Sequence, residues 1–259
     1  LTIEDGSAFM QTRLYTGISG TQTIIQSENS TFQPDFIWGK QRTGAQEPTI
    51  FDAVRGTTKY IQTNSTAAEA TQSGVTAFNS NGFELGSWAV MNQSSNNHVA
   101  SQWLAGNATS TPSGGDIATT CSVNQTAGFS IVSWQGNNTN EQTIAHGLGA
   151  TPSWIIYRKR EGSQWFVQHA GLTGGIANGT STKQLIIDGT DDEGGPFSGG
   201  YIDTIGSTTV RLKRGSSSMN NCNASGDNYI GYFWCEKPGF SKFGSYEGND
   251  NDNGPYIPL

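Results

Sequence analysis

The sequence predicts an all-β protein made of two tandem, internally duplicated β-sandwich-like domains with long loops. Gly, Ser, Thr, Asn and Gln make up 126 of the 259 residues, and these residues favour turns over helix interiors. Runs of β-branched and aromatic residues are short and lie between such turn clusters. No segment has apolar residues at helical spacing over three turns, so at most one or two short helices are expected, with residues 67–72 the first candidate.

An internal repeat sets the domain organisation. Residues 34–42 read against residues 152–160, at an offset of 152 − 34 = 118. Further along, residues 98–103 resemble residues 229–234, at an offset of 229 − 98 = 131, so the extra residues of the second copy lie in its Gly-rich middle. Units of ~115–130 residues suit small β-domains. We therefore expect one domain over residues 1–112 and another over 113–259, with a partial third unit starting at about residue 240.

The strands follow from short apolar runs bounded by turn residues. In the first unit we expect them at 35–40, 49–54, 58–62, 83–86 and 98–104. In the second unit we expect them at 129–134, 154–160, 165–169, 183–187, 208–213 and 229–235. The Gly-rich stretch 188–200 is expected to be a loop. The sequence leaves open whether the units form two separate sandwiches or one fused sheet system.

Charge and cysteine content exclude several classes of protein. The chain has 14 Lys and Arg against 21 Asp and Glu, and this net charge of −7 argues against a nucleic-acid partner. No apolar run is long enough to cross a bilayer, so no membrane insertion is expected, and the first residues lack a signal-peptide pattern. Cys121, Cys222 and Cys235 are odd in number and widely spaced, which predicts neither a disulfide framework nor a zinc site.

Several short motifs occur in a fixed order along nearly the whole chain. They include Leu14-Tyr15-Thr16-Gly17, Pro34-Asp35-Phe36-Ile37-Trp38, His146-Gly147-Leu148-Gly149 and Pro238-Gly239-Phe240-Ser241. With these motifs the chain resembles an uncharacterised repeat domain of marine bacteriophage virion proteins, often tail-fibre-like, and of environmental metagenome proteins. The resemblance implies a non-enzymatic structural or adhesive role in the virion, which is assembled in the host cytoplasm. Its implied partners are other virion proteins, copies of itself and a host surface glycan.

The residues themselves give little sign of catalysis or of a cofactor. There is no GxSxG motif, and the three histidines lie in predicted strands or turns. The glycines do not form a phosphate-binding motif, so no cofactor is expected. Residues 249–254 alternate Asp and Asn but lack the ligand spacing of a calcium loop, so we expect no metal. A glycosidase needs two carboxylates across a cleft, whereas Asp191, Asp192 and Glu193 form one run in a loop.

Candidate contact residues lie in two loops, 86–97 and 188–200. Six tryptophans fall in repeated segments or a predicted strand and are expected in the core, whereas Trp88 has no counterpart in the other unit. Trp88 and the nearby Met91 are therefore candidate contacts for a ligand or partner, together with the acidic run 191–193. The alternative for Trp88 is a hydrophobic plug under its loop. Many weak contacts of this kind would add by avidity, and a carbohydrate-binding module outside a virion is the alternative function.

Overall fold

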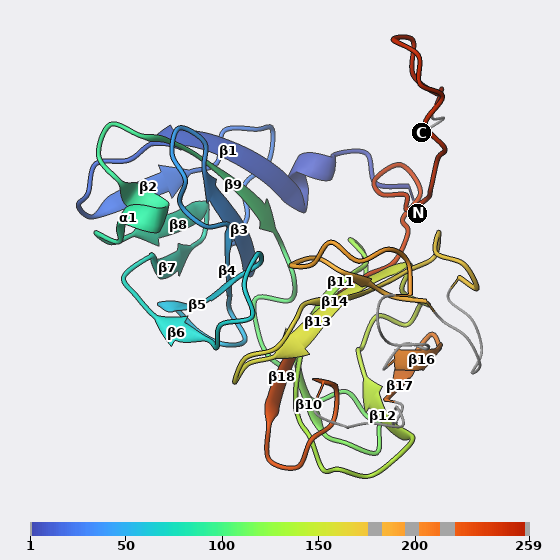
Figure 1. Cartoon of the computed structure of the whole chain (residues 1–259). Helices are drawn as coiled ribbons and strands as arrows, with labels where there is room; N and C mark the ends of the chain where they lie inside the picture. Colours follow the sequence, from blue (N-terminus) through green and yellow to red (C-terminus); the bar gives the residue numbers. More distant parts are fainter. Residues whose placement is uncertain (1, 176–182, 195–201, 213–220, 257–259) are drawn as a thin grey trace.

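The computed structural model describes residues 2–175, 183–194, 202–212 and 221–256 of the chain. Its strands form four antiparallel sheets (Figure 1), which confirms the all-β, sandwich-like prediction. We refer to β1–β9 as the first unit and to β10–β18 as the second. The first unit contains η1 (Gly6–Ala8), β1 (Met10–Thr16), β2 (Gln22–Ile25), β3 (Phe36–Gln41), β4 (Thr49–Asp52), β5 (Lys59–Gln62), β6 (Ala70–Thr71), β7 (Val75–Asn79), β8 (Gly82–Leu85), α1 (Ala89–Asn92) and β9 (Asn97–Trp103). The second unit contains β10 (Thr119–Asn124), β11 (Phe129–Gln135), β12 (Gln142–Ala145), β13 (Trp154–Lys159), β14 (Phe166–His169), β15 (Leu185–Ile186), β16 (Ile202–Ile205), β17 (Thr209–Leu212) and β18 (Asn228–Trp234).

Both units have the same strand order. The large sheet of the first unit runs β1-β9-β3-β4-β5-β6, and that of the second runs β10-β11-β18-β13-β14-β15. The small sheets run β2-β8-β7 and β12-β17-β16. Strands β1, β9 and β3 thus correspond to β11, β18 and β13, and the second unit adds β10 at one edge. The repeated sequence therefore builds a repeated topology.

The strand registers place equivalent residues opposite each other. Phe36 pairs with Trp103 between β3 and β9, and Trp154 pairs with Trp234 between β13 and β18. These positions differ by 118 and 131 residues, the offsets of the repeat. Ring stacking is repeated too, because Tyr15 lies on His98 at 5.2 Å and Trp134 lies on Tyr229 at 5.3 Å between ring centroids.

The large sheets are buried on both faces. Alternate residues of a strand point to opposite faces, so Ile37 packs in the core between the two sheets of the first unit while Phe36 points away from it. In the second unit, Ile155 likewise packs in the core between the two sheets, and Ile156 points away from it. This two-sided burial explains why the central strands read as nearly continuous apolar runs.

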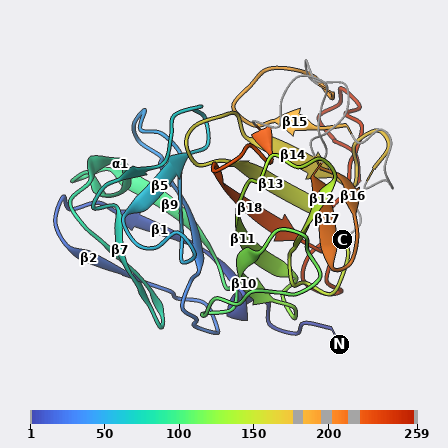
Figure 2. The same cartoon turned by 90° about the horizontal axis from the view of Figure 1, so that it is seen from below.

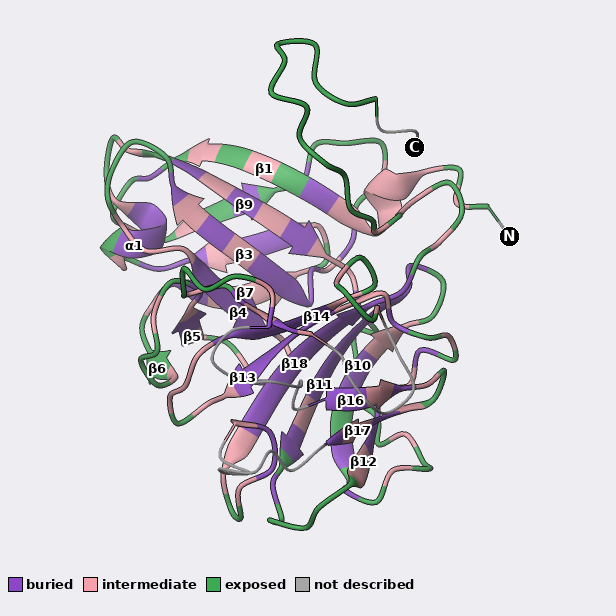
Figure 3. Ribbon diagram, turned by 45° about the vertical axis from the view of Figure 1, so that its right-hand side comes forward, coloured by how far each residue is buried: buried purple, intermediate pink, exposed green. Residues whose placement is uncertain are grey.

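The outward faces of the two large sheets pack against each other. Phe36 and Ile50 of the first unit share one core cluster with Ile156, Ile230 and Tyr232 of the second. The rings of Phe36 and Tyr232 lie 4.6 Å apart. The two sandwiches therefore share a packed core between their large sheets, although each of the four sheets contains strands of one unit only. Figure 3 shows buried residues along β3 and β18 on either side of this core.

One buried asparagine in each unit holds the turn that follows β1 or its equivalent, β11. Asn92 accepts a hydrogen bond from the Ile18 N–H and donates to the carbonyls of Gly20 and Gly86. Asn223 accepts a hydrogen bond from the Asn137 N–H, and its amide donates to the Thr139 carbonyl and the Asn137 side chain. Both asparagines are fully buried.

The predicted strands are all present, but the predicted helix position is wrong. Residues 67–72 are extended and include β6, because the carbonyls of residues 65–67 accept hydrogen bonds from Arg158 instead of helical N–H groups. The short helix α1 lies at Ala89–Asn92 instead. Strands β1, β2, β6, β7, β10, β12 and β16 were not expected, since their residues are largely polar or few. Residues 195–200 of the predicted loop lie outside the described part of the chain.

Candidate functional site

Trp88 lies at the surface of the first unit, directly before α1, and its indole is half-buried. The centroid of its ring system is 4.3 Å from that of Tyr60, on β5, and 6.3 Å from that of Phe51, on β4. Tyr60 is half-buried and Phe51 is fully buried. The indole therefore rests on a fixed aromatic base while part of it stays open to solvent.

Small residues around Trp88 make this arrangement possible. A Cβ at Gly74 would overlap the ring of Phe51 and press on the indole. The hydroxyls of Ser73 and Ser87 lie 3.4 Å apart. Ser73 directly precedes Gly74, and Ser87 directly follows Gly86. We call Trp88, Tyr60, Ser73 and Ser87 the aromatic platform. It combines two aromatic rings with two hydroxyl groups, which is a suitable surface for stacking and hydrogen bonding to a sugar or a peptide.

Met91 has a supporting position. Its side chain is fully buried and lies against Gly39 of β3, where any Cβ would overlap it. Its carbonyl accepts a hydrogen bond from the Tyr15 hydroxyl at 2.8 Å. Met91 thus anchors α1 to the large sheet and has no exposed surface for a ligand in this structure.

The acidic run lies away from the aromatic platform. Asp191 and Asp192 are exposed, and Glu193 is half-buried and accepts a hydrogen bond from the N–H of Thr173. The run follows β15 in the second unit, whereas Trp88 precedes α1 in the first, and these two elements lie well apart in Figure 2. The candidate residues therefore form two separate surfaces.

The predicted core tryptophans lie where the core was expected. Trp134, Trp165 and Trp234 are buried, and Trp38, Trp103 and Trp154 are half-buried against the cluster between the units. The three buried rings also serve as hydrogen-bond donors or stacking partners, Trp165 and Trp234 in that cluster and Trp134 in the core of the second unit. Trp165, for example, donates from its ring N–H to the Gln62 carbonyl at 2.7 Å.

The histidines and cysteines are structural in this fold. Burial lowers the pKa of His146 to about 4, and its ring lies parallel to Phe233 at 5.8 Å. His146 Nδ1 accepts a hydrogen bond from the Leu148 N–H, so the neutral ring carries its proton on Nε2, which faces the Gly206 carbonyl. The three cysteines are buried and unpaired with one another. Burial raises the pKa of Cys121 to about 11, which makes it a poor nucleophile.

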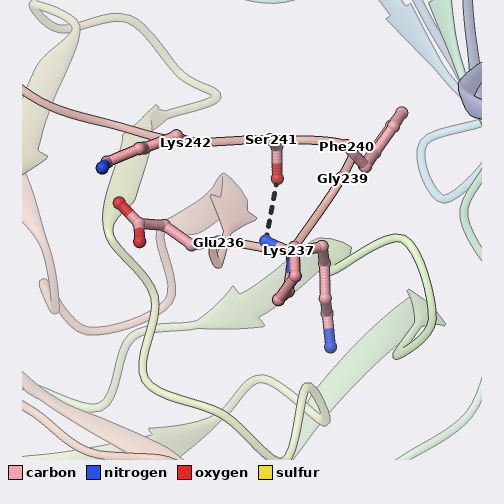
Figure 4. A pocket seen from close by; sticks show the side chains of 7 residues that line it. Glu236, Lys237, Gly239, Phe240, Ser241 and Lys242 are labelled. Carbon is pink, nitrogen blue, oxygen red and sulfur yellow. Dashed lines mark hydrogen bonds between the residues drawn. The ribbon is translucent and has the colours of Figure 1, made fainter. Parts of the chain in front are cut away.

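Two of the hollows on the surface of the described residues are lined by groups that already make contacts within the protein. The first lies along the single turn 236–242 (Figure 4), where the Lys237 N–H donates to the Ser241 hydroxyl at 3.2 Å. The second is lined by Ala68, Glu69, Arg160, Glu161 and Asn228 at the junction of the units. Its charged side chains are already engaged, since Glu69 accepts two hydrogen bonds from Arg160.

The junction between the units contains a buried charged network that sequence reasoning missed. Arg158 donates to the carbonyls of Ser65, Thr66 and Ala67, and its guanidinium lies 5.1 Å from the Trp165 ring. Next to it, the Tyr232 hydroxyl donates to the carboxylate of Asp52. The only sign of this network in the sequence is the repeat, in which Arg158 occupies the position that Lys40 has in the first copy.

Arg55 and Glu69 extend this network. Arg55 is fully buried between the carboxylates of Asp52 and Glu69, with Glu69 at 3.2 Å. Attraction to the Arg160 and Arg55 guanidinium groups, against the effect of burial, lowers the pKa of Glu69. The network ties residues 62–69 of the first unit to β13 of the second and has no open coordination site.

Within the described residues, no group of three or more His, Cys, Asp or Glu side chains is placed to hold a metal ion. In the tail, Asn249 and Asn251 each accept a hydrogen bond from a backbone N–H two residues further on. No helix in the described part of the chain has the length and apolar character needed to cross a bilayer.

Comparison with known proteins assigns the chain to one family. No curated protein and no solved structure matches it. A family model described as a domain of unknown function, DUF7483, matches residues 5–258. This match spans both units and the junction between them. The chain therefore belongs to the DUF7483 family.

Proposed function

We propose that this chain is a non-enzymatic structural and adhesion protein of a bacteriophage virion, in a tail fibre or appendage or as a capsid-surface decoration. It works by multivalent binding to a surface. The aromatic platform carries this proposal, because Trp88 is held half-buried over Tyr60 and Phe51 with part of its side chain open to solvent. The virion setting comes from the sequence resemblance, and the partners are other virion proteins, copies of the chain and a host surface glycan.

The platform suits weak contacts that add together. Two half-buried rings and two hydroxyls offer a small contact area, and such a site binds one sugar unit weakly. Many copies on one particle raise the effective concentration of the sites, so avidity exceeds the affinity of one copy. The packed sandwiches support this use, because they hold the platform on strands and a short helix anchored by Met91.

The second candidate is a carbohydrate-binding module that is not part of a virion. The same rings and hydroxyls favour it, since sugar rings stack on aromatic faces and their hydroxyls pair with Ser73 and Ser87. The two candidates share the binding chemistry and differ in the assembly that carries the chain. Mass spectrometry of purified phage particles from the source of the sequence distinguishes them, because only the first places the chain in the particle.

The binding test is a glycan array probed with the chain displayed in many copies on beads. Trp88→Ala should lower the signal of a bound glycan by about tenfold, the effect of losing ~1.4 kcal/mol of aromatic contact. The matched control is Tyr246→Ala, which removes an aromatic side chain that is 68% exposed in the tail. Thermal unfolding of both variants separates a binding role of Trp88 from a role as a hydrophobic plug, because only loss of a plug lowers the unfolding temperature. Equal binding by Trp88→Ala and the parent protein would refute the platform.

A further inference from the structure

The equivalent strands β1 and β11 differ in what covers their outer edge. In the second unit, β11 is covered by β10, which pairs with it over six residues. In the first unit, β1 is the last strand of its sheet. Among the described residues, no backbone group is bonded to its outer edge. This edge is visible at the margin of the molecule in Figure 3.

The hydrogen-bond pattern shows which groups of β1 are free. Leu104 donates its N–H to the Phe9 carbonyl and Gly17 donates its N–H to the Asn96 carbonyl, both at 2.9 Å. Antiparallel pairing alternates along a strand, so the odd residues of β1 face β9. The N–H and C=O groups of Met10, Thr12 and Leu14 therefore point outward. The equivalent residues of β11 are Phe129, Ile131 and Ser133, which lie opposite Asn124, Ser122 and Thr120 of β10.

The first unit does not form the hairpin that covers β11. Gly128 adopts a φ of +71° in the turn from β10 to β11, which suits glycine. The equivalent position before Met10 is Phe9, which has a φ of −130°, and residues 6–8 form η1, capped by Asp5. The chain thus enters β1 through a short helix, and the outer edge stays open.

Other strand edges in the described sheets are blunted. Strands β6 and β15 have two residues each, and β7 and β16 have register shifts. A parallel bridge from Ile117 covers β12, and an antiparallel bridge from Ser110 covers β10. The remaining open edges are the four residues of β2 and the seven of β1, and β1 pairs with β9 without any register shift. Long regular edges are the ones that recruit another strand.

The residues whose backbone groups point away from β9 form a nearly symmetric pattern of apolar and threonine residues about Leu14. Reading every second residue gives Met10, Thr12, Leu14, Thr16 and Ile18. Leu14 is 55% exposed and Ile18, in the turn after the strand, is 54% exposed. In an antiparallel pair centred on Leu14, each apolar residue meets an apolar residue and each threonine meets a threonine.

We propose that the free edge of β1 binds β1 of a second copy of this chain, antiparallel and with Leu14 opposite Leu14 on a two-fold axis. The pair joins the two large sheets into one continuous sheet across the dimer. Thr12 of each copy lies opposite Thr16 of the other. The Thr16 carbonyl already accepts a hydrogen bond from the half-buried Gln22 side chain at 3.1 Å, and its second lone pair accepts the bond across the dimer.

This dimer deepens the proposed assembly role by naming the surface through which copies meet. It is independent of the aromatic platform. Loss of glycan binding in Trp88→Ala leaves the dimer in place, and loss of the dimer in a Leu14 variant leaves the platform in place. The two proposals therefore fail separately.

The first test is the mass of the chain in solution by light scattering over a concentration series. We expect a mass rising with concentration to twice the 27.6 kDa of one chain. Leu14→Lys places two like charges opposite each other and should give the monomer mass throughout. The matched control is Ile25→Lys, at a residue that is 52% exposed on β2 and should still dimerise. A monomer at every concentration, or a dimer unaffected by Leu14→Lys, would overturn the proposal.

The second test fixes the register by disulfide trapping. Leu14→Cys should form a covalent dimer on mild oxidation, because Cα atoms of a directly opposite hydrogen-bonded pair lie about 5.5 Å apart. Thr12→Cys is the control, since Cys residues at position 12 would be four residues apart along the strands, or ~13 Å. The three native cysteines are buried and do not compete. Equal cross-linking of both variants, or none in Leu14→Cys, would refute the register.

Discussion

The two units have the same strand order but use equivalent positions differently where they meet. Lys40 of β3 and Arg158 of β13 occupy the same place in the repeat. Lys40 donates to the carbonyls of Gln41 and Gln46 within its own unit, whereas Arg158 donates to carbonyls of residues 65–67 across the junction. Duplication thus supplied the scaffold, and one copy then turned a surface position into the centre of an interface.

The same contrast holds inside the sandwiches. Gln26 of the first unit and His146 of the second are equivalent, and both are buried. Gln26 donates to the side chain of Gln102, whereas His146 stacks on Phe233, the residue equivalent to Gln102. Beneath the platform, Phe51 and Tyr60 correspond to the buried Gln168 and Gln184. The aromatic base of Trp88 is therefore a property of the first unit alone.

Replacing Arg158 should give the largest difference in stability between equivalent positions of the two units. Arg158→Ala leaves several part-buried carbonyls at the junction without a donor and empties the space of a fully buried side chain, so we expect a loss of about 3–4 kcal/mol in the free energy of unfolding. Lys40→Ala at the equivalent position should cost less than about 1 kcal/mol, since Lys40 is only half-buried. Chemical denaturation of both variants measures the difference. Similar losses for the two would mean that the junction does not depend on Arg158.

Replacing His146 with glutamine, the residue at the equivalent position 26, tests the contrast between these two buried side chains through the pH dependence of stability. The folded pKa of about 4 lies below the ordinary histidine pKa of 6.5, so between these values the unfolded chain binds a proton that the folded chain does not. Stability contributed by neutral His146 is thus present above pH 6.5 and lost as the pH falls towards 4, by about 3 kcal/mol. His146→Gln should remove this loss, and Gln26→His should add a similar one. Parallel stability curves for His146→Gln and the parent protein would contradict the prediction.

Asp35 should give the opposite pH dependence. It is buried before β3 and accepts hydrogen bonds from the N–H groups of Ala105 and Asn107 in the connection between the units. Burial, opposed by these bonds, raises its pKa from 3.8 to about 6. The folded chain then holds a proton that the unfolded chain has lost, so stability is highest below pH 3.8 and falls as the pH rises to 6.

Asp35→Asn should remove that fall, which is about 2–3 kcal/mol. The asparagine oxygen still accepts the two backbone hydrogen bonds, so the connection keeps its shape. Urea denaturation at several pH values between 4 and 6 measures the effect, and His146→Gln serves as the control with the opposite slope. A stability curve of Asp35→Asn that still falls between pH 4 and 6 would show that another group titrates there.

Much of this fold could be predicted from the sequence, because the central strands are apolar on both faces. The repeat around residues 34–42 and 152–160 gave their equivalence before any register was known. Strands β1 and β10 could not be found in this way, since edge strands bury less side-chain surface and read as polar segments. The packed junction was also out of reach, because a buried Arg158 and a half-exposed Lys40 look alike in a sequence.

The candidate site was predictable only in part. Trp88 stood out because it lacked a counterpart in the repeat, and the structure leaves it half-buried. Tyr60 and Phe51 gave no signal, since their contact with Trp88 depends on bringing β4 and β5 under a loop that follows β8. The proximity of Met91 to Trp88 in sequence suggested a shared surface, but Trp88 is the extended residue before α1, whereas Met91 lies inside the helix and is buried against Gly39.

The smallest expected difference concerns the feature that the units share. Asn92→Ala and Asn223→Ala each remove a buried amide that holds the turn after β1 or β11, at a cost of about 2 kcal/mol. Because both asparagines make the same kind of contacts, the two losses should agree within ~0.5 kcal/mol, as measured by thermal unfolding. A much larger loss for one of them would mean that its turn also supports contacts peculiar to that unit. Equal losses would show that the buried asparagine belongs to the fold, whereas Arg158, His146 and Trp88 mark what each copy acquired separately.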